Sequence, residues 1–312
     1  MSPSDFSDAA LVLLGHGTTL NADSAAPVFQ HCAELRRRKC FADVREAFWK
    51  QDPQIKDVLA NLTAPRVFLV PLFISEGHFS EEVIPRELGF QKNELGEVSR
   101  VQQRPPVILP LLFRRGEGRG EGPFSSRGSR TEDLNTQTLF YCHPVGSHDS
   151  MTAVLLARAR DIVQKFPFPR APKPADTTLF IAGHGTEQNE NSRKAIDRQV
   201  ELIRTRKLYA DVQSVFLDEE PRIAQCYQLA RTRNVVMVPF FISDGLHVRE
   251  DIPVLLGEPQ RVVQQRLQNG QPTWRNPTER KDKLLWYSSS VGTDPRLADV
   301  ILARAREAAS SH

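Results

Sequence analysis

The sequence predicts an α/β protein made of two tandem lobes, each a doubly wound parallel sheet, with a cleft between them. The main observation is an internal repeat, because the tetrapeptide GHGT at 15–18 returns at 183–186. One offset of 168 residues, the distance from His16 to His184, aligns the two halves without a gap as far as Gly89 and Gly257. In each half, short apolar runs alternate with helical patterns, which indicates parallel strands joined by right-handed crossovers.

The offset later falls to 146 residues, the distance from Tyr141 to Tyr287, so the first half holds 22 extra residues (168 − 146). A stretch rich in Arg, Gly and Glu at about 114–131 accounts for them, and its composition predicts a disordered surface insertion. A solvated loop explains it more simply than a site for anionic partners. The predicted organisation is an N-terminal lobe at 1–166, a Pro-rich linker at 167–175 and a C-terminal lobe at 176–312.

The elements of the first half follow in order. The apolar run at 11–14 predicts a buried strand that stops at Gly15. A helix follows from Ser24, a good N-cap, and the basic residues at 36–39 occupy its C-terminal end, where the helix dipole favours cations. The later elements alternate strand and helix: a strand at 44–49, a helix at 53–62, a strand at 67–73, a strand at 139–142 and a helix at 151–163.

Composition excludes several classes of function. The formal net charge of +3 is too small to indicate nucleic-acid binding. The N-terminal residues lack a basic segment and a long apolar run, so we expect a cytoplasmic protein without a signal peptide or a membrane span. The four cysteines show no CxxC pair and no zinc or iron–sulfur spacing. We therefore expect reduced packing residues and no iron–sulfur cluster.

Histidines gather at the predicted carboxyl ends of the strands, where open parallel sheets bind ligands. His16 and His184 follow the first strand of each half, and glycine on both sides leaves their imidazoles accessible. His247 follows the third strand of the second half. His78 is the weaker candidate, because Phe79 aligns with His247 and His78 is displaced by one residue. A capping role would be the simplest account of a lone histidine, but the duplicated pattern favours function at His16, His184 and His247.

Neutral imidazoles at such an edge suit ligation of a borderline divalent metal, proton uptake near neutral pH, or both in sequence. Several other chemistries lack their motifs in this chain. No GxxxxGK[ST] phosphate loop and no GxGxxG after a strand is present, so ATP and dinucleotide chemistry are not expected. GxSxG and HExxH are absent as well.

The ordered motifs resemble those of the class II chelatases of the sirohydrochlorin cobaltochelatase type, the CbiX family. One mark is a strand ending in a histidine between small residues with an Asn a few positions on, here Asn21 and Asn189. A second is GxHxxxDIP, which stands at 245–253 and is altered at 77–85. A third, a Gly followed two residues later by His or Asp, stands at 146–148 and 292–294. The resemblance covers nearly everything except the insertion.

This resemblance implies a fused, two-domain chelatase, a monomer with pseudo-dimeric lobes, that inserts a divalent metal into a reduced tetrapyrrole without ATP. The metal is a substrate, with Co²⁺ expected first and Fe²⁺ or Ni²⁺ as alternatives. Histidine can both ligate the ion and accept a pyrrole proton. The expected metal ligands and catalytic groups are His16, His184 and His247, with His78 as a further catalytic candidate. The residues expected to bind the substrate are Asn21, Asn189, Arg86, Arg193 and Arg249, with the arginines contacting its carboxylates.

An acidic residue after the second strand also accompanies the histidines in this family, and Asp218 occupies that position in the second half. The first half has Lys50 there, so the second lobe is expected to hold the more complete metal site. Two alternatives stay open: a metal or tetrapyrrole carrier without turnover, and a metal-dependent hydrolase on the same fold.

Overall fold

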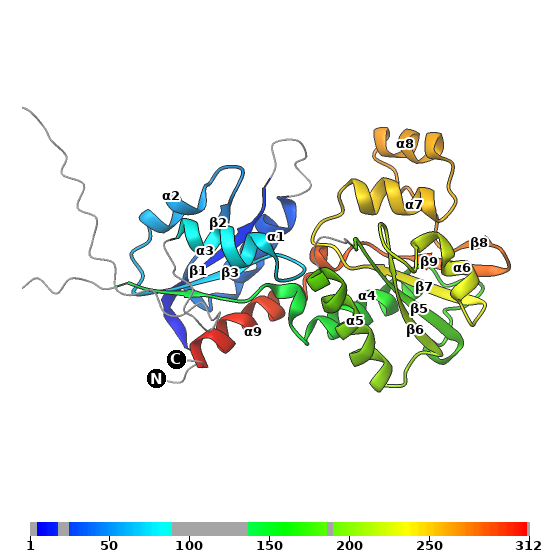
Figure 1. Cartoon of the computed structure of the whole chain (residues 1–312), viewed down its shortest axis with the longest axis horizontal. Helices are drawn as coiled ribbons and strands as arrows, with labels where there is room; N and C mark the ends of the chain where they lie inside the picture. Colours follow the sequence, from blue (N-terminus) through cyan, green and yellow to red (C-terminus); the bar gives the residue numbers. More distant parts are fainter. Residues whose placement is uncertain (1–4, 18–24, 89–136, 186–189, 311–312) are drawn as a thin grey trace, which may run out of the picture.

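The computed structural model describes residues 5–17, 25–88, 137–185 and 190–310. Asn21, Asn189, Ser24 and the insertion expected at about 114–131 lie outside these ranges. Within the described part of the chain, no helix is long and apolar enough to cross a membrane. Two sheets lie side by side along the long axis of the molecule (Figure 1).

The first sheet has the strand order β2-β1-β3-β4, and all its strands are parallel. Its strands are β1 (Phe6–Gly15), β2 (Phe41–Phe48), β3 (Arg66–Pro71) and β4 (Thr138–Tyr141). The helices of this half are α1 (Ala26–Arg38), α2 (Ile55–Ala60), α3 (Ile84–Glu87) and α4 (Met151–Lys165). The predicted order of strands and helices is therefore present. One detail differs: α1 has Ala25 at its N-cap position, and Pro27 lies in its first turn.

The second sheet repeats this order as β6-β5-β7-β9 and adds β8 antiparallel to β9. Its strands are β5 (Thr177–Gly183), β6 (Asp211–Phe216), β7 (Asn234–Pro239), β8 (Thr278–Arg280) and β9 (Lys283–Tyr287). Its helices are α5 (Glu190–Thr205), α6 (Cys226–Leu229), α7 (Ile252–Leu255), α8 (Gln260–Gln268) and α9 (Leu297–Ser310). The hairpin turn between β8 and β9 places both Lys281 and Asp282 at positive φ. Sequence analysis missed this hairpin because its turn lacks the glycine that usually marks one.

The central strands β1, β3, β5 and β7 bury both of their faces, as parallel sheets with helices on both sides do. Leu11 and Leu13 of β1 point into one core cluster, while Val12 and Leu14 point into another. The first of these clusters continues into the second lobe, where it includes Leu179 and Ile181 of β5. The two lobes therefore share one continuous hydrophobic core.

The last helix of each repeat lies on the sheet of the other repeat. Helix α4, which ends the first repeat, packs against β7 and β9, and helix α9, which ends the chain, packs against β3 and β4. Figure 1 shows α9 beneath the first sheet and α4 beside α5 of the second. The segment predicted as a linker, 167–175, joins α4 to β5, and both of these elements belong to the second lobe in space.

Candidate functional site

Both GHG motifs form the same tight turn at the carboxyl end of the first strand of their sheet. Gly17 and Gly185 adopt φ values of 72° and 68°, a left-handed conformation that glycine accepts at no steric cost. Each turn brings a glycine carbonyl to 2.8 Å from Nδ1 of the preceding histidine, His16 or His184. A carbonyl can only accept a hydrogen bond, so Nδ1 donates in these contacts, and in the neutral form of the ring Nε2 then keeps its lone pair.

In the second lobe two histidines meet. The ring centroids of His184 and His247 are 4.9 Å apart, and the ring planes are 86° to one another. The side chains are 44% and 52% exposed, so both imidazoles can reach a ligand from solvent. The structure therefore brings together the two histidines that the sequence placed after β5 and β7.

Carboxylates hold the Nδ1 atoms of this histidine pair. Oδ2 of Asp218 lies 3.2 Å from Nδ1 of His184, and Oδ2 of Asp251 lies 2.6 Å from Nδ1 of His247. Histidines that bind metals usually donate one ring N–H to a carboxylate or carbonyl and bind the metal through the other nitrogen. Asp218 therefore lies where it can orient His184. Among the described residues, no hydrogen bond engages the Nε2 atom of either histidine.

The segment after β7 is a π-helical turn at His247–Asp251, and the segment after β3 is a π-helical turn at Phe79–Val83. In each turn the N–H of the following isoleucine, Ile252 or Ile84, bonds to a carbonyl five residues earlier. Single π turns are rare and occur frequently at functional sites. Here the turn sets the spacing that lets Asp251 reach His247.

Sequence analysis named Asp251 only as part of the motif at 245–253. The i,i+4 spacing of a histidine and an aspartate next to a strand end would have been the signal for the pair.

The first lobe has a different arrangement at the equivalent place. His16 packs against Phe79 with ring centroids 4.9 Å apart and against Trp49 at 5.7 Å. His78 points elsewhere: it is 73% exposed, and its Nδ1 lies 3.2 Å from a carboxylate oxygen of Glu82. The structure therefore brings neither His78 nor another histidine to His16 in the part of the chain that it describes.

The three predicted arginine contacts differ in their surroundings. Arg193 bonds to a carboxylate oxygen of Glu219 at 2.9 Å and lies over the ring of Phe216 at 4.9 Å. Arg86 is exposed next to the first π-helical turn, and Arg249 is half-buried within the second. All three lie on segments that follow the strand ends, and their contacts to a polyanionic substrate stay a prediction.

The loops that close both sites depend on a second pair of glycines. A Cβ on Gly292 would lie 1.9 Å from the carbonyl oxygen of Ile242, and one on Gly146 would lie 2.0 Å from that of Ile74. The carboxylate of Asp244 accepts a hydrogen bond from the Ser290 N–H at 2.7 Å. These contacts lock the loop after the last strand against the loop that leads to the π-helical turn.

Among the described residues, no three His, Cys, Asp or Glu side chains converge as a complete metal site. Metal ligation by the predicted set therefore stays a prediction. The buried cysteines fit packing roles, because burial raises the pKa of Cys142 and of Cys226 to about 12 and keeps both thiols protonated.

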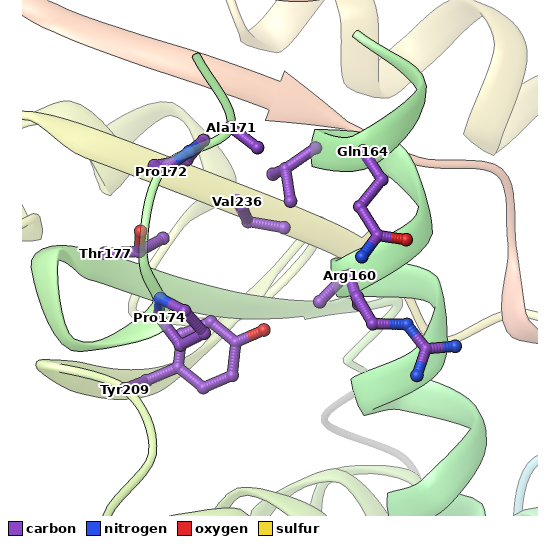
Figure 2. Close-up of a pocket in the computed structure, with 10 residues that line it drawn as sticks. Arg160, Gln164, Ala171, Pro172, Pro174, Thr177, Tyr209 and Val236 are labelled. Carbon is purple, nitrogen blue, oxygen red and sulfur yellow. The ribbon is translucent and has the colours of Figure 1, made fainter. Parts of the chain in front are cut away.

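A cavity of about 130 Å³ lies away from all of these residues (Figure 2). It is formed between helix α4 and the chain that leads into β5, and its lining includes Gln164, Pro174, Thr177 and Tyr209. Thr177 is the first residue of β5, so the cavity lies at the amino end of the strands. Open parallel sheets bind ligands at the opposite edge, so this cavity is not the functional site.

Fold and site together define the class, a two-lobed α/β protein of the chelatase fold, and solved structures agree. DR2241 of Deinococcus radiodurans, described as a multi-domain protein with structural similarity to chelatases, matches with a TM-score of 0.66 and 26% identity, over 95% of this chain and 54% of that chain. SirB of Bacillus subtilis, solved with Fe³⁺, matches with a TM-score of 0.59 over 97% of this chain and 96% of that chain. At 14% identity, SirB shows the fold alone.

Sequence comparison identifies the family. The CbiX family profile matches residues 10–162 and 178–308, one match for each half of the repeat. A probable sirohydrochlorin cobaltochelatase of Halobacterium salinarum is 37% identical over 299 residues, 96% of this chain and 91% of that protein. The sirohydrochlorin cobaltochelatase of Methanopyrus kandleri is 26% identical over 138 residues, 42% of this chain and 95% of that protein. The chain belongs to the CbiX family, which confirms the predicted fold, the predicted family and the assignment to the chelatase enzymes.

Proposed function

We propose that this chain inserts a divalent metal ion into a sirohydrochlorin-type tetrapyrrole without ATP, and that Co²⁺ is its physiological metal, ahead of Fe²⁺ or Ni²⁺. The observation that carries the proposal is the pair of half-exposed imidazoles of His184 and His247, 4.9 Å apart with both Nδ1 atoms engaged. The names of the Halobacterium and Methanopyrus relatives support cobalt and sirohydrochlorin.

The chemistry of insertion fits this pair. A divalent ion must lose part of its water shell, enter the macrocycle and replace two pyrrole N–H protons, which leave as two H⁺. Imidazole nitrogens are suitable ligands for Co²⁺, and a neutral imidazole can also accept a proton. We assign His184 and His247 to delivery of the metal and removal of protons, with Asp218 as a third ligand or as the carboxylate that orients His184.

The substrate contacts in this proposal are the predicted ones: Asn21, Asn189, Arg86, Arg193 and Arg249. Carboxylates on the macrocycle would form charge-assisted hydrogen bonds with the guanidinium groups. Arg193 already bonds to Glu219, so its guanidinium is held in place before the substrate arrives.

His16 and His78 carry no metal in this proposal, because His16 has Phe79 where His184 has His247. We further propose that the protein works as a cytoplasmic monomer.

The test is anaerobic absorption spectroscopy of the full chain with sirohydrochlorin and Co²⁺, Fe²⁺ or Ni²⁺ in turn, against the uncatalysed rate. A metallated spectrum that forms faster with protein, and no longer forms in a His184→Ala, His247→Ala double variant, is the expected result. The matched variant is His16→Ala, the same change in the other lobe. If His16→Ala abolishes metallation and the double variant keeps it, the metal site lies in the first lobe. Tight Co²⁺ binding without metallation would instead support a carrier.

A further inference from the structure

The two copies of the duplicated site differ in the charge and polarity of the residues around the first histidine. At three of four repeat positions around the site the second lobe has a carboxylate or a second imidazole, whereas the first lobe has an aromatic, apolar or cationic residue at all four. At the 168-residue offset, the second lobe's Leu217, Asp218, His247 and Asp251 correspond to the first lobe's Trp49, Lys50, Phe79 and Val83.

The backbone shows that these positions are equivalent in space. The Lys50 N–H bonds to the carbonyl of His16 at 3.0 Å, and the Asp218 N–H bonds to the carbonyl of His184 at the same distance. The side chains of Lys50 and Asp218 therefore leave from the same place beside the first histidine of their lobe. A negative charge in the second lobe is replaced by a positive charge in the first.

The first lobe also presents aromatic surface at this edge. Trp49 and Phe79 contact each other at 4.3 Å with ring planes at 84°, and His16 packs on both. Trp49 and Phe79 are only half-buried, and His16 is exposed. The indole is held by its N–H bond to Glu87 at 3.3 Å, and the Lys50 ammonium lies 4.7 Å from the centre of its ring. These three rings and one ammonium form an aromatic and cationic surface at the carboxyl edge of the first sheet.

We propose that this surface, formed by His16, Trp49, Lys50 and Phe79, binds the planar, carboxylate-bearing tetrapyrrole, while the second lobe binds the metal. The proposal rests on the proposed function. The reaction has two substrates of opposite charge, a divalent cation and a polycarboxylate macrocycle with aromatic faces. Lys50 can donate a charge-assisted hydrogen bond to a substrate carboxylate, and the rings of Trp49 and Phe79 can pack against the macrocycle. The carboxylate of Asp218 suits the cation and would repel the macrocycle's carboxylates.

The experiment replaces the first lobe's residues with those of the second. Binding of metal-free sirohydrochlorin to the full chain is measured by absorption titration for the wild type, for Lys50→Asp and for Trp49→Leu with Lys50→Asp. Binding of Co²⁺ alone is measured on the same proteins. The matched control is Lys165→Asp, which removes an exposed lysine that also lies over an aromatic ring, Phe166, at 5.4 Å.

We expect Lys50→Asp to weaken macrocycle binding by about tenfold or more, the effect of losing one charge-assisted hydrogen bond, and to leave Co²⁺ binding unchanged. His184→Ala with His247→Ala should do the reverse. The inference is overturned if Lys50→Asp binds the macrocycle as tightly as Lys165→Asp does. It is also overturned if the wild type does not bind the macrocycle. A wild type that binds the macrocycle through Lys50 but never metallates it contradicts the proposed function alone.

Discussion

Asp251 offers a sharp test of the proposed metal site. Its Oδ2 atom lies 2.6 Å from Nδ1 of His247, four residues earlier in the π-helical turn. Asp251→Asn keeps the size of the side chain and removes its charge. A carboxylate that orients a metal-binding histidine typically contributes 10–100-fold in affinity. The two side chains are 52% and 49% exposed, so solvent weakens the pair, and we expect the low end, about tenfold or ~1.4 kcal/mol.

The assay is a Co²⁺ titration of the full chain, followed by the visible absorption of the bound ion, together with the rate of metallation. Glu250→Gln is the matched control, because Glu250 lies in the same turn but accepts its hydrogen bond from Gln264 at 3.1 Å. The reasoning predicts weaker Co²⁺ binding for Asp251→Asn alone. Equal Co²⁺ affinity in the two variants would refute an orienting role for Asp251, and equal loss in both would point to damage of the turn.

Three further predictions concern His31, Gly292 and helix α9. His31 is buried, and its Nε2 donates a hydrogen bond to the carbonyl of Gly292 at 2.7 Å. Burial lowers the pKa of His31 in the folded protein. The unfolded chain takes up a proton at this histidine below about pH 6.5, so the folded protein loses stability as the pH falls below that value. His31→Gln, which copies Gln199 of the other lobe, should keep the bond and remove that part of the pH dependence in urea unfolding measured at pH 5–8. Gly292→Ala should lower the free energy of unfolding by roughly 1–3 kcal/mol, because its Cβ would meet the Ile242 carbonyl; an unchanged denaturation midpoint would contradict this. Deletion of α9 should speed hydrogen exchange at the amides of β3 more than at those of β7. Equal protection in both strands would contradict the packing of α9 on the sheet of the other repeat.

The sequence was sufficient for the strands that the two repeats share and for the place where His184 and His247 meet, for clear physical reasons. Fully buried parallel strands are continuous apolar runs, as at 11–14, and such runs stand out without any structure. The glycines around His16 and His184 mark tight turns, and strand ends are where parallel sheets bind ligands. The histidine pair in the second lobe followed from these two local signals. The ligand contacts of Asn21 and Asn189 stay predictions, because both residues lie outside the described ranges.

The sequence did not predict contacts that depend on the direction in which a side chain points. Asp251 reaches His247 within a π-helical turn, and although the i,i+4 spacing of the two residues is visible in the sequence, it does not by itself predict that turn. The packing of His16 on Trp49 and Phe79 likewise depends on three loops that meet only in the folded chain. Alignment of the repeats did show that Phe79 replaces a histidine, but it did not show that an aromatic cluster results.

The exchange of α4 and α9 lay beyond sequence analysis for a different reason. An amphipathic helix shows that it needs an apolar partner, but in a duplicated chain both sheets offer the same apolar pattern, so the pattern cannot distinguish them. The structure shows the consequence at the site loops: Arg158 of α4 bonds to the Thr293 hydroxyl, and Arg304 of α9 bonds to the Ser147 hydroxyl. Each lobe is therefore completed by the other repeat. The first repeat is therefore needed for the fold of the second lobe, because the core of that lobe includes α4.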